Sequence, residues 1–325
     1  MIFFFLTNQC NLNCIHCYYP SNYIKESEDK KKILKILDLI LQLGTKEIRL
    51  TGGEPLICKQ FTEVIKLIGK TNCKIDITTN GTLLSEKVLY PILNFRNSIK
   101  TIWISVYGAD EKDYEFITRC KGSYKLFRKG LNNLVKYGIQ VGINASVGFG
   151  DFKKWFYTLS LLAAEGVSRF KILWTAPNGR AIVHWPYVSC NPNTWVKIYP
   201  IFEKLSDRYS NVEWRVEKSF LTKDEKNAFS TDYFESMQCL LKHRSLLSID
   251  QNGYLYPCCL LVGLDKYIIG NINDEIVKKN FEKLQVQPIF SLLKKRCFHY
   301  KNLESKIDLN KSNLIPICPL HLEKV

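Results

Sequence analysis

Hydrophobic and polar positions alternate with two different periods along the N-terminal part of the chain. Short apolar runs rich in β-branched and aromatic residues predict strands, and the segments between them repeat apolar residues at helical spacing. The predicted strands cover residues 2–6, 46–51, 74–79, 101–106, 139–147 and 169–175. The predicted helices cover residues 29–43, 59–69, 85–94, 123–137 and 152–165.

Three of these helices are followed by a glycine, at Gly44, Gly138 and Gly166. Glycine is the residue that most often ends a helix, because it adopts the left-handed conformation without strain. Strands that alternate with helices form parallel sheets of the α/β class. Ligands of such sheets bind at the carboxyl ends of the strands, so we expect the functional residues in the loops that follow the strands.

The alternation ends with a last predicted helix at residues 193–207 and a strand-like run at residues 211–216, after which a polar stretch follows. The predicted organisation is a first domain of residues 1–217, a linker of residues 218–234 and a second, smaller domain of residues 235–325. The second domain shows no strand–helix alternation. Its run from Ile249 to Tyr254 contains Asn-Gly, which predicts a β-hairpin.

Composition indicates the cellular compartment of the chain and the class of its partners. It has 325 residues, 12 cysteines and a formal net charge of +15. The apolar run from Ile2 to Leu6 is too short for a signal peptide, and no run approaches the roughly 20 residues that span a bilayer. We therefore expect a cytoplasmic protein without a membrane partner, whose cysteines bind metal or take part in chemistry. The positive charge suits an acidic partner or simply reflects a lysine-rich composition, and we expect no nucleic acid.

Three cysteines follow the first predicted strand with the spacing C-x3-C-x2-C, at Cys10, Cys14 and Cys17. Three thiols on one loop can converge on a metal centre, and thiolates are the usual ligands of iron–sulfur clusters. Three ligands on a four-iron cluster leave one iron open to another molecule. A zinc site completed by His16 or by a distant cysteine is the alternative that the triplet alone leaves open.

A second motif follows the second predicted strand, where Thr51 leads into Gly52, Gly53, Glu54 and Pro55. Paired glycines let a backbone approach a ligand closely and offer amide donors. The Glu54 carboxylate could accept hydrogen bonds from a cationic amino group. A Gly-Gly-Glu turn by itself is a weak signal, but together with the cysteine triplet it becomes specific.

The two motifs together closely resemble those of the radical S-adenosylmethionine (radical SAM) superfamily. The third strand ends in Thr-Asn-Gly at residues 79–81, similar to the family's TNG turn. The fourth ends at residues 104–108 and is followed by Asp113 and Arg119, which resembles another family motif, although Cys-Lys-Gly stands where the family has Gly after Arg. Residues 177–181 resemble the GRA segment of one large subgroup. The resemblance implies a partial (βα)6, TIM-like barrel.

The same resemblance implies the cofactors and their residues. Cys10, Cys14 and Cys17 would hold a 4Fe-4S cluster, and S-adenosylmethionine would chelate its fourth iron. The implied cofactor-binding residues are Gly52, Gly53 and Glu54 at the methionine end, Ser105 and Arg119 at the carboxylate or ribose, and Asn80 on the same wall. An electron from a donor such as flavodoxin or ferredoxin would cleave the sulfonium and give a 5′-deoxyadenosyl radical, which abstracts hydrogen from the substrate.

The second domain resembles the auxiliary-cluster domain of the SPASM/twitch subgroup. Its five cysteines fit the shorter twitch form, which holds one extra 4Fe-4S cluster. The implied auxiliary ligands are Cys239, Cys258, Cys297 and Cys318, although the last two are separated more widely than is usual in the family. Cys259 is either a structural thiol or a catalytic one that returns a hydrogen atom to a substrate radical, as in peptide epimerases of the superfamily. Buried thiols or a zinc knuckle are the alternatives for this domain.

The expected function is that of a radical SAM enzyme that modifies a ribosomally synthesised peptide by a crosslink or an epimerisation. The subgroup resemblance and the basic charge support this hypothesis. The start of the first strand at Ile2 counts against it, because no separate leader-binding domain is expected before that strand. The alternatives are a radical SAM dehydrogenase of a sugar or aminocyclitol and, from another class, a non-catalytic zinc or nucleic-acid-binding module.

Overall fold

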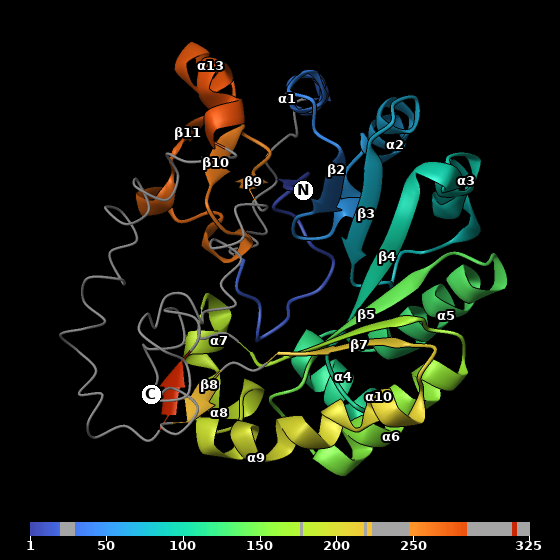
Figure 1. Cartoon of the computed structure of the whole chain (residues 1–325). Coiled ribbons are helices and arrows are strands. Elements are labelled where there is room, and N and C mark those ends of the chain that lie inside the picture. Colours follow the sequence, from blue (N-terminus) through green and yellow to red (C-terminus); the bar gives the residue numbers. More distant parts are fainter. Residues whose placement is uncertain (20–29, 176–177, 218–219, 223–246, 285–313, 317–325) are drawn as a thin grey trace.

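The computed structural model describes residues 1–19, 30–175, 178–217, 220–222, 247–284 and 314–316 (Figure 1). Its main feature is one sheet with the strand order β11-β10-β9-β1-β2-β3-β4-β5-β6-β7. The strands of its parallel part are β1 (Ile2–Phe5), β2 (Glu47–Thr51), β3 (Lys74–Thr79), β4 (Ile99–Val106), β5 (Val141–Ser146), β6 (Arg169–Leu173), β7 (Glu213–Val216) and β9 (Leu247–Ile249). Neighbours along the chain from β1 to β7 are also neighbours in the sheet, as strand–helix units require.

Helices connect the parallel strands and cover the outer face of the curved sheet (Figure 1). They are α1 (Lys30–Gln42), α2 (Phe61–Gly69), α3 (Glu86–Asn94), α4 (Glu111–Thr118), α5 (Ser123–Lys136) and α6 (Phe152–Ala164). After β6 come α7 (Arg180–Val183), α8 (Trp185–Val188), α9 (Pro192–Glu203) and α10 (Leu205–Arg208). Single 3-10 turns lie at Pro55–Ile57, Arg96–Ser98, Cys259–Leu261 and Asp265–Tyr267. The predicted α/β class is therefore confirmed.

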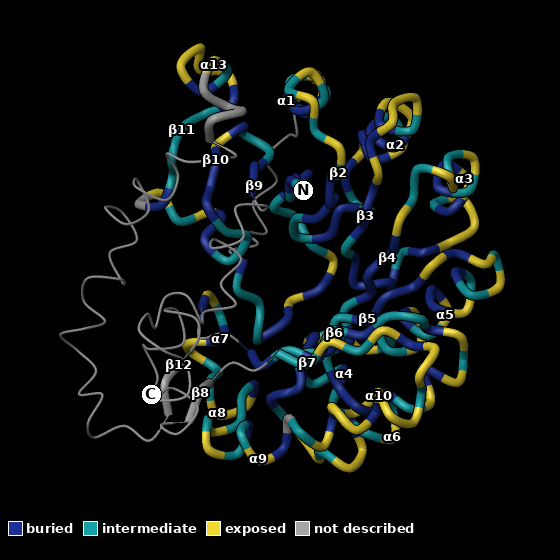
Figure 2. Tube along the Cα trace, viewed as in Figure 1, coloured by how far each residue is buried: buried dark blue, intermediate teal, exposed yellow. Residues whose placement is uncertain are grey.

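The outer face of the sheet is the apolar core. Ile75 and Ile77 of β3 and Ile104 of β4 are fully buried and belong to one cluster with Val64 and Ile68 of α2. Figure 2 shows the same division in the helices, whose buried sides face the sheet and whose exposed sides face outward. Side chains of a strand alternate between two faces, so the remaining strand positions point to the concave face.

The concave face carries polar residues in the middle of the strands. The guanidinium of Arg49 (β2) lies over the ring of Trp103 (β4), and the amine of Lys171 (β6) lies over the same ring. Arg169 of β6 donates a hydrogen bond to Thr101 of β4. These contacts link alternate strands across the concave face. Near the carboxyl ends of β3 to β6 the inward positions stay partly exposed, at Thr78, Ser105, Ser146 and Leu173, so this part of the concave face is accessible.

The C-terminal part continues the same sheet. β9 pairs in parallel with β1, where Ile2 lies opposite Leu247 and Phe4 opposite Ile249. β10 (Tyr254–Tyr256) and β11 (Gly270–Asn271) then follow antiparallel, which confirms the predicted hairpin. α13 (Glu275–Leu284) ends this segment, and β8 (Phe220–Thr222) pairs with β12 (Leu314–Pro316). Most of the predicted linker lies outside the described residues, so the division into two domains stays a prediction.

Two details differ from the sequence-based expectations. The two-turn helix α4 was not predicted, and its start is explained by Asp110, whose carboxylate accepts a hydrogen bond from the amide of Asp113. The strand predicted at residues 169–175 ends at Leu173. In the described part of the chain no helix has the length and apolar character needed to cross a membrane.

Candidate functional site

The cysteine loop, residues 7–17, follows β1 at the carboxyl edge of the sheet. Cys14 is buried, whereas Cys10 and Cys17 are half-buried. The loop is held along its length by backbone hydrogen bonds to the end of α4. The amide of Asn13 donates to Thr118 at 3.1 Å, and the amide of Ile15 donates to Ile117 at 2.9 Å. The three thiols therefore lie on the loop at the carboxyl end of β1, as the sequence predicts.

The Gly-Gly turn after β2 packs directly beneath the cysteine loop. The amide of Gly53 donates to the carbonyl of Thr7, and that of Glu54 to the carbonyl of Gln9, both at 2.8 Å. A Cβ on Gly52 would lie 2.4 Å from the Thr7 oxygen, and one on Gly53 would lie 2.1 Å from the Gln9 oxygen. Only glycine allows this approach. The Gly53 amide is thus used to hold the cysteine loop, a role that the sequence did not indicate.

Glu54 joins the ends of β2 and β3. Its side chain is fully buried, and one carboxylate oxygen accepts hydrogen bonds from the Thr79 hydroxyl at 2.7 Å and the Leu56 amide at 3.1 Å. The other oxygen accepts one from the Asn80 amide at 2.8 Å. Burial raises the pKa of Glu54 to about 7 despite these donors. Because a carboxylate oxygen can accept two hydrogen bonds, the second oxygen keeps capacity for one more donor.

Asn80 connects the Thr-Asn-Gly turn to the cysteine loop. Its side-chain amide donates to Asn11 at 2.9 Å, and its side-chain oxygen accepts from the Thr82 amide and hydroxyl. Asn11 donates in turn to the Thr82 hydroxyl at 2.8 Å. Asn80 is 4% exposed, so in this structure it fixes the wall of the site.

The segment that begins α7 holds the cysteine loop from the other side. The Arg180 side chain donates from Nε to the carbonyl of Cys14 at 2.8 Å, and its backbone amide donates to the carbonyl of Cys17 at 2.9 Å. A Cβ on Gly179 would lie 2.5 Å from the Cys17 oxygen. Gly179 and Arg180 therefore hold the cysteine loop by its backbone carbonyls, and Arg180 brings a positive charge next to the thiols.

The three thiols form a donor set that suits an iron–sulfur cluster. Burial raises the pKa of Cys10 to about 12, with Glu54 adding to the effect, and burial likewise raises the pKa values of Cys14 and Cys17. Arg180 opposes the shift at all three. Buried thiols that titrate this high gain charge only when a cation compensates it, which bound iron would do.

Within the described residues, no three His, Cys, Asp or Glu side chains meet closely enough to hold a single metal ion. The ligands of a cluster bind different irons and need not meet at one point. The alternative of a zinc site completed by a distant cysteine stays open, because Cys239, Cys297 and Cys318 lie outside the described residues. The Nδ1 of His16 is buried without a hydrogen-bond partner, and its ring packs at a tilt against the ring of Tyr107, with the ring centres 4.6 Å apart.

The two remaining cofactor-binding candidates, Ser105 and Arg119, lie in different surroundings. Ser105 is half-buried on the concave face and hydrogen-bonds Tyr107, which itself lies beside Cys14. Arg119 ends α4 in the left-handed conformation, with φ of 55°, and its guanidinium lies over the ring of Phe116 at 4.9 Å. Arg119 is exposed, so it lies at the rim of the site, next to the residues that bind the cysteine loop.

Two of the C-terminal cysteines approach the cysteine loop. Cys258 and Cys259 pack against the buried cluster of Phe5, Tyr19 and Tyr256, together with Cys17 and Tyr18. The hydrogen bond from Cys258 lowers the pKa of Cys259, and the nearby charge of Arg49 acts in the same direction. Cys239, Cys297 and Cys318 lie outside the described residues, so the auxiliary ligand set stays a prediction.

Sequence reasoning missed the contributions of Tyr107 and Arg180. Arg180 stood in the quoted Gly-Arg-Ala segment, and that motif was the signal that could have identified it. Tyr107 gave no such signal, because its contact with the ring of His16 is formed only by folding.

The comparisons with known proteins agree with this geometry. The sequence matches the Radical SAM superfamily over residues 4–162. It is 27% identical to the GTP 3′,8-cyclase of Petrotoga mobilis over 320 residues, which cover 93% of this chain and 95% of that protein. It is 26% identical to the GTP 3′,8-cyclase of Clostridium botulinum over 313 residues, covering 90% and 94%.

Solved structures show the same fold. SuiB of Streptococcus suis bound to S-adenosylmethionine has a TM-score of 0.69 at 14% identity, covering 90% of this chain and 67% of SuiB. The native anSMEcpe structure with bound AdoMet and a Cp18Cys peptide has a TM-score of 0.63 at 18% identity, covering 86% and 79%. At these identities the likeness concerns the fold, which is a partial barrel with a mostly parallel sheet.

Proposed function

Because the chain matches the radical SAM superfamily over residues 4–162, and members of that superfamily carry a 4Fe-4S cluster and S-adenosylmethionine, we propose that Cys10, Cys14 and Cys17 hold that cluster. The observation that carries the proposal is the clamped cysteine loop, which Gly53, Glu54 and Arg180 hold by backbone and side-chain hydrogen bonds. The chain is a radical SAM enzyme, so the alternative of a non-catalytic module is wrong.

Some residues around the cysteine loop position its backbone, and others would bind S-adenosylmethionine. When bound, the cluster and S-adenosylmethionine supply a 5′-deoxyadenosyl radical that abstracts hydrogen from the substrate. Gly52, Gly53 and Asn80 keep the strand ends in place beneath the loop, and the free acceptor capacity of Glu54 suits the amino group of the methionine end. Ser105, half-buried on the concave face, offers a hydroxyl where the rest of the cofactor would lie.

For the substrate we propose a ribosomally synthesised peptide that is crosslinked or epimerised. The Gly-Arg-Ala segment of the subgroup and the net charge of +15 support a peptide with acidic residues. Cys259 packs against the same buried cluster as Cys17, a position that suits a hydrogen donor to a substrate radical. We further propose that Cys258 is one ligand of an auxiliary cluster, and that flavodoxin or ferredoxin reduces the enzyme.

A second candidate is a cyclisation on a purine ribonucleotide. It is favoured by the relatives that align over nine-tenths of their length and are named GTP 3′,8-cyclases. Incubating the reduced enzyme separately with peptides encoded beside its gene and with GTP separates the two candidates. A mass change or deuterium incorporation in a peptide supports the first, and a cyclised nucleotide overturns it.

The cluster assignment is tested by replacing Cys10, Cys14 and Cys17 singly with Ala. Each variant should lose the cleavage of S-adenosylmethionine to 5′-deoxyadenosine, because one missing thiolate leaves an iron without its ligand. Cys73→Ala is the matched control, since Cys73 is a thiol as buried as that of Cys14 and precedes β3 at the opposite end of the sheet. Cleavage that persists in the three variants would refute the assignment.

Iron content tests the auxiliary cluster. Under this proposal the anaerobically purified enzyme holds about eight irons per chain, four in each cluster. Cys258→Ala should lower the count to about four without abolishing the cleavage of S-adenosylmethionine. About four irons in the unaltered enzyme would contradict a second four-iron cluster.

A further inference from the structure

A charged layer lies on the concave face below the cysteine loop, at the middle of the strands. It consists of Arg49 on β2, Asp76 on β3, Trp103 on β4, Arg169 and Lys171 on β6, and Ser248 on β9. Arg49 and Asp76 are each less than a tenth exposed. Burying charge in this way is costly unless every charge is compensated, so the pairing of each group indicates what the layer can bind.

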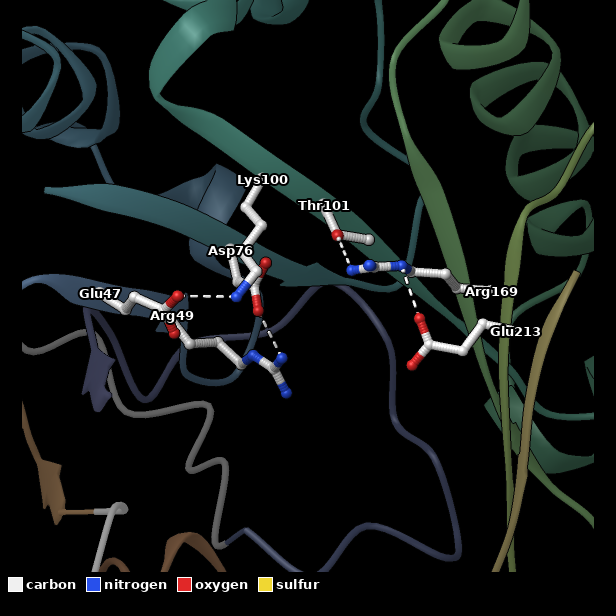
Figure 3. A network of polar contacts seen from close by, with 7 residues as sticks. All are labelled: Glu47, Arg49, Asp76, Lys100, Thr101, Arg169 and Glu213. Carbon is white, nitrogen blue, oxygen red and sulfur yellow. Dashed lines mark hydrogen bonds and ion pairs between the residues drawn. The ribbon is translucent and has the colours of Figure 1, made fainter.

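The two arginines of the layer are already paired with carboxylates. Figure 3 shows that Arg49 is held by Asp76 and that Arg169 is held by Glu213 and the Thr101 hydroxyl. The Arg169–Glu213 pair joins Nε to Oε2 at 3.0 Å. Neither guanidinium therefore needs a further anion for charge balance.

Lys171 is different. Its amine lies 3.9 Å from the centre of the Trp103 ring, and no carboxylate of the described residues forms an ion pair with it. Trp103 can lie flat here because residue 142 is glycine, where a Cβ would come within 2.5 Å of the indole. The side chain of Lys171 is therefore an ammonium on an aromatic platform, with Arg49 and Arg215 as the nearest like charges.

Several polar atoms of the layer also lack partners. Arg49 Nε, Asp76 Oδ1, Trp103 Nε1 and Ser248 Oγ are buried and have no hydrogen-bond partner in the structure. Ser248 belongs to β9, and its backbone lies opposite Phe3 of β1. Buried polar atoms are satisfied in nearly all proteins, so four unsatisfied ones in one layer point to a polar group that is bound there in the working enzyme.

We propose that the layer is a substrate subsite in which Lys171, supported by Trp103, binds a carboxylate of the peptide. This inference rests on the proposed peptide function. It adds that the part of the peptide that reaches deepest into the concave face is an acidic side chain or the C-terminus. A carboxylate fits better than a phosphate. One ammonium balances one negative charge, and Asp76 repels a second.

The test uses two short probes that differ in charge alone. Acetyl-Ala-Glu-Ala-amide and acetyl-Ala-Gln-Ala-amide are titrated against the cluster-loaded full chain, and binding is followed by saturation-transfer NMR. The glutamate probe should bind about tenfold more tightly. Lys171→Met should remove the difference, whereas Lys171→Arg should keep most of it. Lys153→Met, which alters an exposed lysine of α6, should change nothing.

Equal binding of the two probes to the unaltered enzyme would overturn the proposal, as would a difference that survives in Lys171→Met. Inorganic phosphate that displaces the glutamate probe at lower concentration than acetate would overturn the choice of a carboxylate. The production of 5′-deoxyadenosine is measured in the same samples. If the enzyme prefers the glutamate probe but produces no 5′-deoxyadenosine, only the proposed function is contradicted. If it produces 5′-deoxyadenosine but binds both probes equally, only this inference is contradicted.

Acidity gives a second readout. Burial lowers the pKa of Lys171 to about 7, with Arg49 and Arg215 acting in the same direction and Asp76 and Glu213 opposing them. The charged ammonium is thus present below that pH and lost above it. The preference for the glutamate probe should therefore fall as the pH rises through 7, and a preference that stays constant to pH 9 would contradict the role of Lys171.

Discussion

At the scale of single residues, burial decides the chemistry of this protein more than local sequence does. The same cause raises the pKa values of the three loop thiols and of Glu54, and lowers that of Lys171. In each case the charged form is disfavoured until a partner arrives. A sequence motif names such residues, but the strength of the effect depends on how completely the fold removes water from them.

At Glu217 the effect of burial on a pKa can be measured through the free energy of unfolding. It follows β7, its backbone accepts a hydrogen bond from Trp195, and burial raises the pKa of its carboxyl from 4.5 to about 7. A raised pKa means that the protonated form stabilises the fold. This contribution is complete below about pH 4.5 and is lost as the pH rises through 7.

We predict that Glu217→Gln, which cannot ionise, gains stability relative to the unaltered protein across this range, by up to about 3 kcal/mol. Urea unfolding at several pH values measures the difference. Glu203→Gln, at an exposed position of α9, is the control and should show no such trend. A constant difference between Glu217→Gln and the unaltered protein would contradict the prediction.

At the scale of elements, the turns after β2 and β3 and the start of α7 act as a frame for the cysteine loop. Glycine is required where two backbones touch, at Gly52 and Gly53 beneath the loop and at Gly179 beside it. The loop itself has no regular structure that would hold its shape. Its geometry is therefore set by elements that are distant in sequence and adjacent in the sheet.

Gly53→Ala tests this frame. The added methyl group would overlap the Gln9 carbonyl and push the cysteine loop away from its place. We expect iron content and the cleavage of S-adenosylmethionine to fall at least tenfold, while circular dichroism shows an intact fold. Gly44→Ala is the control, because it also replaces a loop glycine but meets nothing within 4 Å. It should cost about 1 kcal/mol of stability and leave iron content unchanged. Normal iron loading in Gly53→Ala would show that the loop adapts.

At the scale of the whole molecule, the C-terminal hairpin belongs to the barrel's own sheet. β9 covers the edge of β1, the strand that leads into the cysteine loop. Leu261 and Val262 are buried in the same cluster as Phe5, and the side chain of Asn178 donates to the carbonyl of Leu260 at 2.6 Å. These contacts couple the C-terminal segment to the site.

A chain that ends at residue 217 should therefore not be an independent barrel. Removing β9 leaves β1 with an open edge and exposes apolar side chains, both of which promote aggregation. We expect the shortened chain to be insoluble or to bind less than one cluster, as judged by size-exclusion chromatography and iron analysis. A soluble monomer with four irons would instead confirm that residues 1–217 fold as a separate domain.

Much of the fold could be predicted because its signals are local. Each predicted strand from β1 to β6 exists, and the five helices predicted between them begin and end within two residues of their expected bounds. The helix predicted at residues 193–207 is two helices, α9 and α10. α4 was missed because its eight residues carry too few apolar positions for a helical period. The parallel pairing of β9 with β1 was also missed, since residues so far apart in sequence leave no local pattern of their contact.

The sequence by itself determined the strand–helix order, the spacing of the three cysteines and the glycines of the turns, because these depend on residue type and short-range periodicity. Only the tertiary structure decided that Glu54 ties two strand ends together, that Arg180 clamps the loop and that Lys171 lies on Trp103. These relations join residues on different strands, and they arise when the sheet curves and its concave face excludes water.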